Sequence, residues 1–533
     1  MSESISRRNL LKIGGGAGVA SLAGVTLLPG EARADSWTNE LVKPGADGRL
    51  VYAPDGRGKV IPDFSWAGYR NGAEKLPDVP VVTKIGPIKG ETDSTARIQA
   101  ALDDVGARKP DANGFRGALL LKAGNYPVGG VLKMKRSGVV LRGEGQWEDP
   151  SANTVITGTA GVRNTVLWVD GAAGDWDSAE LAGPRTDVTS TLVKAGQRRL
   201  TVGSTANLKV GDNIIIVHPD TPTWRDAINN GGVKDKPSWE AGKYPIMYNR
   251  YIQEIDGNDI VICAPVFNDL RHSLSKSYVY AWDQTGLVRN VGIENLRIDM
   301  AHQGPYDETH PESCIVISRA EDVWVKDASL LHFSKSAVWV QRSTRVTVQG
   351  ARAMEPRSRV VGGKRYSFCA AGDAQQILFR DLEANDARHA FIATGTTTCS
   401  GNVWLNGSSV NGRNESGGHH RWSQGLLYDN IKELSNQSDN LWALGLHNRG
   451  DKGDGHGWSS VNSVAWNCTV DSGRQLCVQA PPTAQNFAIG TQGIVTGENW
   501  YTHTKGYEDG TNELGLDPSS LYLAQLRDRL TAS

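Results

Sequence analysis

The stretch Val323-Trp324-Val325-Lys326-Asp327-Ala328 decides the fold, because it is one copy of a pattern that keeps returning along the chain. Apolar residues alternate with other residues, which predicts a β-strand. Asp, Asn or Gly then follows, and these residues tolerate the left-handed backbone of a sharp bend. Beyond residue 290, copies of the pattern begin at Val291, Val323, Val346, Ile377, Val403, Leu426 and Val464.

The spacing of these copies identifies the class of repeat. Successive copies begin 32, 23, 31, 26, 23 and 38 residues apart, so the longer units look like the 23-residue unit plus a loop. Repeats of this length are typical of solenoids and propellers, but a propeller blade needs about 40 residues. We therefore predict an all-β fold, a right-handed parallel β-helix whose coils bury their inward side chains by stacking. A propeller is the second choice.

The chain before the repeats fits the same plan. Thr92-Asp93-Ser94-Thr95 predicts the start of a helix with an apolar face of Ile98, Leu102 and Val105. Such a helix would cap the open end of the core. Between residues 186 and 275 closely spaced strands predict a small antiparallel β insertion. The aromatic residues of its 219–249 loop suit either sugar binding or packing.

The N-terminus carries an export signal. Ser6-Arg7-Arg8-Asn9-Leu10-Leu11-Lys12 matches the twin-arginine motif, with Leu where Phe is commoner, and Ala32-Arg33-Ala34 matches a cleavage site. We expect the twin-arginine machinery to export the protein to the periplasm or the medium. Beyond this signal, no apolar run in the sequence approaches membrane-spanning length, so no membrane association is expected after the signal is removed.

The predicted organisation has six parts. They are a signal peptide (1–34), an N-terminal extension (35–80), the first coils with the capping helix (81–185), the inserted β subdomain (186–275), the main coils (276–500) and a C-terminal tail (501–533).

Composition narrows the class of partner. The 57 Lys and Arg residues nearly balance the 58 Asp and Glu residues. A nucleic-acid-binding protein carries a basic footprint, so nucleic acid is not expected as a partner. The 6 cysteines form no zinc or redox spacing, and we expect them to be small buried residues.

Three stretches resemble the pectate lyase-like superfamily of parallel β-helix proteins. They are the segment from Asp93 to Leu102, the segment from Ala118 to Tyr126, and Val139-Val140-Leu141-Arg142-Gly143-Glu144-Gly145. The later part is similar to a group of exported bacterial β-helix proteins that share Arg388-His389, His419-His420-Arg421-Trp422, Asn448-Arg449-Gly450 and Gly455-His456-Gly457-Trp458. The resemblance implies a polysaccharide partner, most often an acidic one, and a lyase or a hydrolase.

Two departures limit what the resemblance implies. Calcium-dependent pectate lyases use carboxylate clusters with an R-x-P-x-x-R stretch, and neither is found here. No cofactor is therefore expected, because the sequence has no motif that supports calcium binding. Polygalacturonase-type hydrolases show four motifs in order, and Gly455-His456-Gly457 matches one of them.

Polar residues occupy the connections between consecutive predicted strands. Side chains just outside successive coils line up along a β-helix, so these residues are expected to share a lengthwise groove. The predicted catalytic residues are His420, His389, Arg421, Arg388, His456, Tyr366 and Lys335, and the predicted substrate-binding residues are Arg449, His419, Trp422, Trp458 and Asn448.

These residue types suit β-elimination on a uronic acid. An arginine matches a carboxylate bidentately and would neutralise it, and a neutral histidine would remove the adjacent proton. The alternatives for the base are His420 and His389, for the neutraliser Arg421, Arg388 and Arg449, and for the acid Tyr366, Lys335 and His456.

Other functions stay open from the sequence. Hydrolysis would need two carboxylates, and its candidates are Asp373, Glu383, Asp386, Glu415, Asp429, Asp451 and Asp454. A non-catalytic glycan-binding protein is a further alternative. A zinc site at His419, His420 and His456 is disfavoured, because neighbours on a strand point to opposite faces. For Trp422 and Trp458, packing is favoured over sugar stacking.

Overall fold

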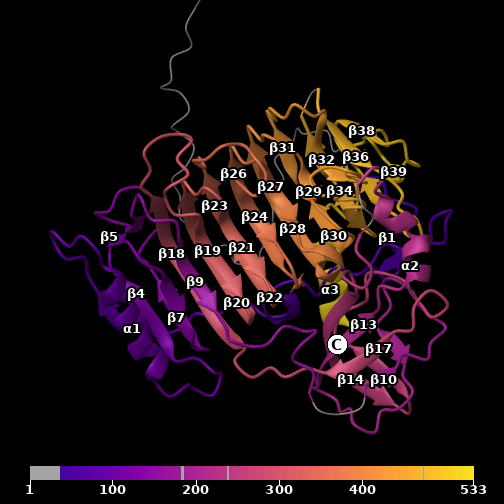
Figure 1. Ribbon diagram of the computed structural model, residues 1–533, viewed down its shortest axis with the longest axis horizontal. Helices are drawn as coiled ribbons and strands as arrows, with labels where there is room; N and C mark the ends of the chain where they lie inside the picture. Colours follow the sequence, from indigo (N-terminus) through magenta and orange to yellow (C-terminus); the bar gives the residue numbers. More distant parts are fainter. Residues whose placement is uncertain (1–35, 182–184, 237–238, 472, 533) are drawn as a thin grey trace, which may run out of the picture.

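The computed structural model describes residues 36–181, 185–236, 239–471 and 473–532, and the predicted signal peptide lies outside these residues. The chain forms a parallel β-helix (Figure 1), in which strands of successive coils lie side by side along the solenoid. One wall is a ten-stranded parallel sheet. Its strands in spatial order are β6 (Leu132–Met134), β9 (Thr165–Asp170), β19 (Ser313–Ser318), β21 (Ser336–Gln341), β24 (Tyr366–Ala370), β27 (His389–Ala393), β29 (Ser416–Gly418), β32 (Trp442–Leu446), β36 (Gln475–Val478) and β38 (Ile494–Thr496).

The repeats found in the sequence build the remaining walls. They fall on or beside β18 (Val288–Met300), β20 (Ala320–Leu331), β22 (Ser343–Gln349), β26 (Leu378–Asn385), β28 (Ser400–Val410), β30 (Ser423–Asp429) and β34 (Val464–Trp466). Every copy has its bend in the left-handed region, at Asn295, Asp327, Gly350, Asp381, Asn406, Asn430 and Asn467. The bends also bond between coils, since the Asn467 amide donates to Asn430 Oδ1 at 2.7 Å.

The core consists of inward side chains that stack in register. Phe379, Trp404 and Tyr428 are paired on adjacent strands. Their rings lie nearly parallel, with centroids 5.4 Å and 4.9 Å apart. Helix α1 (Thr95–Ala107) covers the first coils with the predicted face of Ile98 and Leu102. The predicted solenoid with its capping helix is therefore confirmed.

The insertion is an antiparallel sheet of β10 (Thr186–Asp187), β17 (Tyr278–Ala281), β13 (Asn213–His218), β14 (Ile246–Asp256), β15 (Asp259–Ile262) and β12 (Arg199–Thr201). It packs beside the later coils (Figure 1). Arg250, wholly buried, donates to Gln375 Oε1 at 2.7 Å, and Trp224 packs edge-on against Trp422 at 5.9 Å. Trp224, Trp239 and Tyr248 of the loop are buried, so packing, not sugar binding, is their role.

All six cysteines lie in the described part of the chain, buried and without disulfides. Within that part, no helix is long and apolar enough to cross a membrane.

Candidate active site

The structure brings most of the predicted site residues into one cluster on the outer face of the ten-stranded sheet. Rings at His389, His419, His420 and His456 form a continuous chain of contacts, with centroids between 4.6 Å and 5.3 Å apart. Tyr366 joins this chain, 5.1 Å from the His389 ring. These residues come from the starts of β24 and β27 and from the connections after β29 and β32.

Three donors converge on the phenol oxygen of Tyr366. Arg388 Nη1 donates to it at 3.2 Å and the Gly363 amide at 3.4 Å. His419 Nε2 lies 3.4 Å away and also donates, because the Nδ1 atom of the same ring accepts from Arg449 Nη1. The oxygen thus has no protein acceptor for its own proton among the described residues. Positive and partially positive groups therefore surround the phenol oxygen.

The tautomers of two histidines follow from their partners. Arg449 Nη1 can only donate, so His419 Nδ1 accepts from it and Nε2 carries the proton. His389 Nδ1 lies 2.5 Å from the Glu415 carbonyl oxygen, which can only accept, so Nδ1 carries the proton there. The Nε2 atom of His389 therefore holds a free lone pair, and it is buried with no hydrogen-bond partner among the described residues.

All four histidines of the cluster are neutral at ordinary pH. Burial lowers the pKa of His420 to about 4 and that of His456 to about 3, and neighbouring arginines act in the same direction. Burial also lowers the pKa of His389 and of His419 well below the usual range. A neutral imidazole is the form that can accept a proton.

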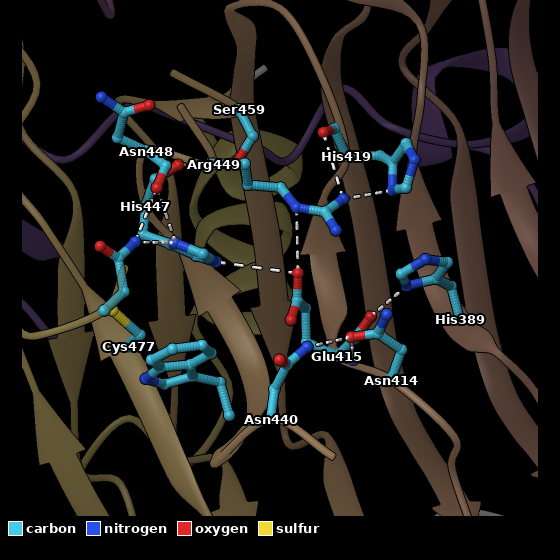
Figure 2. A network of polar contacts seen from close by, with 12 residues as sticks. His389, Asn414, Glu415, His419, Asn440, His447, Asn448, Arg449, Ser459 and Cys477 are labelled. Atoms are coloured by element: carbon cyan, nitrogen blue, oxygen red, sulfur yellow. Dashed lines mark hydrogen bonds and ion pairs between the residues drawn. The ribbon is translucent and has the colours of Figure 1, made fainter. Parts of the chain in front are cut away.

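Glu415 lies at the centre of the network in Figure 2. Its buried carboxylate is 3.1 Å from Arg449 Nε and 3.9 Å from His447 Nε2. The Arg449 contact is a charge–charge contact whose N–H direction misses hydrogen-bond geometry. Through Arg449 the carboxylate fixes the tautomer of His419, and through its own carbonyl Glu415 fixes that of His389.

The cationic side chains of the site differ in whether a carboxylate pairs with them. Arg449 pairs with Glu415, and Arg421 pairs with Asp454 at 2.8 Å. Among the described residues, neither Arg388 nor Lys335 has a carboxylate within ion-pair distance. Lys335 instead places its ammonium 4.3 Å from the Trp339 ring, and Trp339 stacks on Tyr366 at 6.3 Å. Two cations without a protein anion therefore flank Tyr366.

Unpartnered polar atoms are concentrated here. Buried polar groups normally find a partner. Across the described residues, nine of the buried side-chain nitrogen and oxygen atoms that lack a hydrogen bond belong to His389, Glu415, His420, Arg421, His447, Arg449, His456 and Trp458. Such a concentration is expected where a ligand or ordered water supplies the missing bonds.

The sequence predicted an open groove, and the structure shows a layered cluster instead. Tyr366, His389 and His419 are buried, whereas Arg388, His420 and Arg421 are partly exposed above them. The inner groups are thus screened from water, where charge interactions are stronger. The partly exposed layer marks the side from which a ligand would enter.

One expectation about the direction of side chains was wrong. His419 and His420 were expected to face opposite sides, yet their rings lie 5.3 Å apart in one cluster. The reason is that β29 ends at Gly418 and the chain then turns, with left-handed backbone at Arg421 and Trp422. Glycine is required nearby, because a Cβ on Gly445 would lie 2.5 Å from the His447 ring.

Three predicted substrate-binding residues are packing residues. Trp422 is wholly buried and donates to Asn268 at 2.9 Å, which ties the insertion to the coils. Trp458 is 2% exposed and packs on His503. The buried Asn448 side chain bonds to the Gly232 carbonyl and to His503. Each of these side chains packs against other parts of the protein, away from Tyr366 and His389.

Of the seven carboxylates considered for hydrolysis, Glu415 and Asp454 contact the cluster. The others serve elsewhere: for example, Asp429 caps α3 (Leu521–Thr531) through Tyr522 N, and Asp386 pairs with Arg365. Within the described part of the chain, no three His, Cys, Asp or Glu side chains converge to hold a metal ion. His447 was missed at the sequence level, although it stands directly before the Asn448-Arg449-Gly450 motif.

Comparisons with known proteins concern the fold. No family model matches the chain, and no curated protein matches it by sequence. Among solved structures, a tailspike of Pseudomonas phage phi297 is 13% identical, with 78% of this chain and 73% of that chain covered and a TM-score of 0.38. The A-module of mannuronan C-5 epimerase AlgE6 from Azotobacter vinelandii is 12% identical over 79% of this chain and 95% of its own, with a TM-score of 0.32. A pectin methylesterase in complex with a hexasaccharide is 10% identical over 82% and 91%, with a TM-score of 0.27.

Proposed function

We propose that this protein is an exported polysaccharide lyase that cleaves a uronic-acid-containing glycan by β-elimination. The proposal includes export by the twin-arginine route to the periplasm or the medium. One observation carries the reaction: three hydrogen-bond donors converge on the phenol oxygen of Tyr366, and one of them, Arg388, has no carboxylate within ion-pair distance among the described residues.

The proposed roles follow from these contacts. Arg388 binds the C6 carboxylate of the uronate, which makes the C5 proton more acidic. His389 Nε2 takes that proton, and the electron pair of the C5–H bond forms the C4–C5 double bond. The C4–oxygen bond breaks, and Tyr366 gives its proton to the departing oxygen. The three donors then hold the phenolate that remains.

Elimination fits the cluster better than hydrolysis does. Hydrolysis needs one protonated carboxyl and one ionised carboxylate flanking the bond. Asp454 pairs with Arg421, whose hydrogen bond lowers the pKa of the Asp454 carboxyl, so it is a poor acid. Glu415 is buried against Arg449. Neither carboxylate is therefore placed as the acid of a hydrolase.

The test is an assay of the purified protein on a panel of acidic and neutral polysaccharides. A lyase releases reducing ends together with the ultraviolet absorbance of an unsaturated uronate, whereas a hydrolase releases reducing ends alone. Tyr366→Phe removes the proton donor and keeps the ring, and His389→Ala removes the base. Loss of a general acid or base should lower kcat about 10²- to 10⁴-fold.

The controls separate chemistry from folding. His420→Ala leaves both proposed groups in place and should cost less than His389→Ala. Reducing ends without the ultraviolet signal would replace the lyase by a hydrolase. A Tyr366→Phe variant that is folded and fully active would remove Tyr366 from the mechanism.

A further inference from the structure

Three lysine ammonium groups stand over indole rings along one wall of the solenoid. Lys133 lies 5.7 Å from the Trp168 ring, Lys335 lies 4.3 Å from the Trp339 ring, and Lys452 lies 4.4 Å from the Trp500 ring. They are the only lysine–aromatic contacts of this kind among the described residues. We call them the lysine–indole couples.

The register places the first two couples in one outward row. Trp168 pairs with Val316 and Val316 with Trp339 across β9, β19 and β21. The inward neighbours Leu167, Ile317 and Val340 fill the core. Trp168 and Trp339 are two strands apart, or about 10 Å, since strands are spaced about 4.8 Å. Val316 fills the space between them and is 8% exposed.

The third couple lies beyond the candidate active site. Trp500 packs on Trp442, the first residue of β32, with centroids 4.6 Å apart. Between β21 and β32 lie β24, β27 and β29, which carry or directly precede Tyr366, His389 and His419. The couples therefore flank the cluster on both sides, and about 30 Å of wall separates the first from the third.

The chemistry of a couple suits one repeat of an acidic polysaccharide. An indole ring offers an apolar face to a sugar ring, and an ammonium attracts a carboxylate. The positive charge is not fully used within the protein: Lys335 has no carboxylate within ion-pair distance in the described part of the chain, and the Lys133–Asp170 contact is long, at 3.8 Å. Trp168, Trp339 and Trp500 are all partly exposed.

We infer that the couples are binding subsites for a polyuronate chain that lies along the solenoid axis and crosses the site. This inference rests on the proposed function and adds two properties to it. The substrate is a polymer with carboxylates at repeated positions, and the bond that breaks is internal, because subsites lie on both sides of Tyr366.

The test measures binding apart from catalysis. The parent protein is Tyr366→Phe, and calorimetry gives its affinity for polygalacturonate, alginate and uronate trimers. The double variant Lys133→Ala/Trp168→Ala removes the outermost couple. It should bind the preferred polymer about five- to tenfold more weakly, from the loss of one cation–indole subsite, and should bind trimers unchanged.

The chain supplies a matched control on another wall. Arg352 stands 5.2 Å from the ring of Trp147, which is 55% exposed, beside β23 (Arg352–Met354). Arg352→Ala/Trp147→Ala removes an equivalent cation–indole contact away from the site and should leave polymer affinity unchanged. Equal losses in both double variants, no loss in the first, or equally tight binding of neutral dextran would overturn the inference.

The experiments distinguish an error in the proposed lyase reaction from an error in the proposed subsites. Polymer binding that depends on Lys133 and Trp168, without unsaturated products from the wild type, would retain the subsites and refute the lyase. Unsaturated products from a protein whose polymer affinity does not depend on Lys133 and Trp168 would retain the lyase and refute the subsites. Early products of mixed length are expected, and release of a single short product from chain ends would refute internal cleavage.

Discussion

A carboxyl group inside the solenoid gives a stability prediction that can be worked out from the structure. Glu433, on β31 (Lys432–Leu434), is 1% exposed and accepts a hydrogen bond from Ser416 Oγ at 2.5 Å. Burial raises the pKa of this carboxyl from 4.5 to about 8. Between these values the folded protein keeps a proton that the unfolded chain has released.

The difference between the two pKa values fixes the direction in which stability changes with pH. Stability from Glu433 is fully present below pH 4.5 and is lost as the pH rises toward 8. The interval between the two pKa values corresponds to about 5 kcal/mol. Glu433→Gln has no proton to lose, so its stability relative to the wild type should improve by about 4 kcal/mol between pH 5 and pH 9.

The assay is urea unfolding followed by tryptophan fluorescence for both proteins at both pH values. Comparing the two differences cancels every other titrating group, because both proteins share them. Glu383→Gln is the control, since Glu383 is 57% exposed and pairs with Arg352 on the outside, and exposed pairs contribute about 1 kcal/mol or less. A wild-type-to-variant difference that stays constant within about 1 kcal/mol would show that Glu433 titrates like a solvated carboxyl.

Three further predictions concern the site and the core. Because the pKa of His389 lies well below its usual range, the pH–rate profile should stay flat down to pH 5, whereas a base with a pKa of 6.5 would lose about thirtyfold there; a fall beginning near pH 6.5 would exclude His389. Glu415→Gln leaves the buried Arg449 without its anion and should lower the unfolding free energy by about 3–5 kcal/mol, measured by urea unfolding; an unchanged stability would show that the pair contributes nothing. Trp404→Ala removes the middle ring of the core stack and should cost about 3–5 kcal/mol, seen as a lower urea midpoint; a cost below about 1 kcal/mol would mean that the neighbouring coils close the gap.

The fold was predictable because its determinants are local. Each coil carries its own alternating strand and its own bend, and the bends at Asn295 and Asp327 are left-handed as expected. Stacking then follows from repetition alone. The propeller alternative fails because successive strands pair in parallel along the whole wall.

The site was predictable in part, for the same reason. Tyr366 and His389 begin strands of the ten-stranded sheet and His420 follows one, at positions that recur once per coil, so their convergence follows from the repeat. The contacts of Glu415 and His447 depend on the pairing of particular coils. They also depend on the short strand β29, which ends before His419. The packing of Trp422 depends on an insertion that begins more than 200 residues earlier in the chain. Periodicity carries no information about such contacts.

The docked insertion has a consequence for the order in which the protein folds. The loop that carries Arg449 and His456 is held from one side by Trp239, whose indole donates to Gly455 across 216 residues of sequence, and from the other by Tyr501, which accepts from Asp451 N. Contacts this distant form slowly, because a long loop must close first. Arg449 and His456 should therefore reach the cluster last, and on refolding the proposed lyase activity should return after the far-ultraviolet signal of the strands. A chain that has stacked its coils but not seated its insertion would look folded and remain inert.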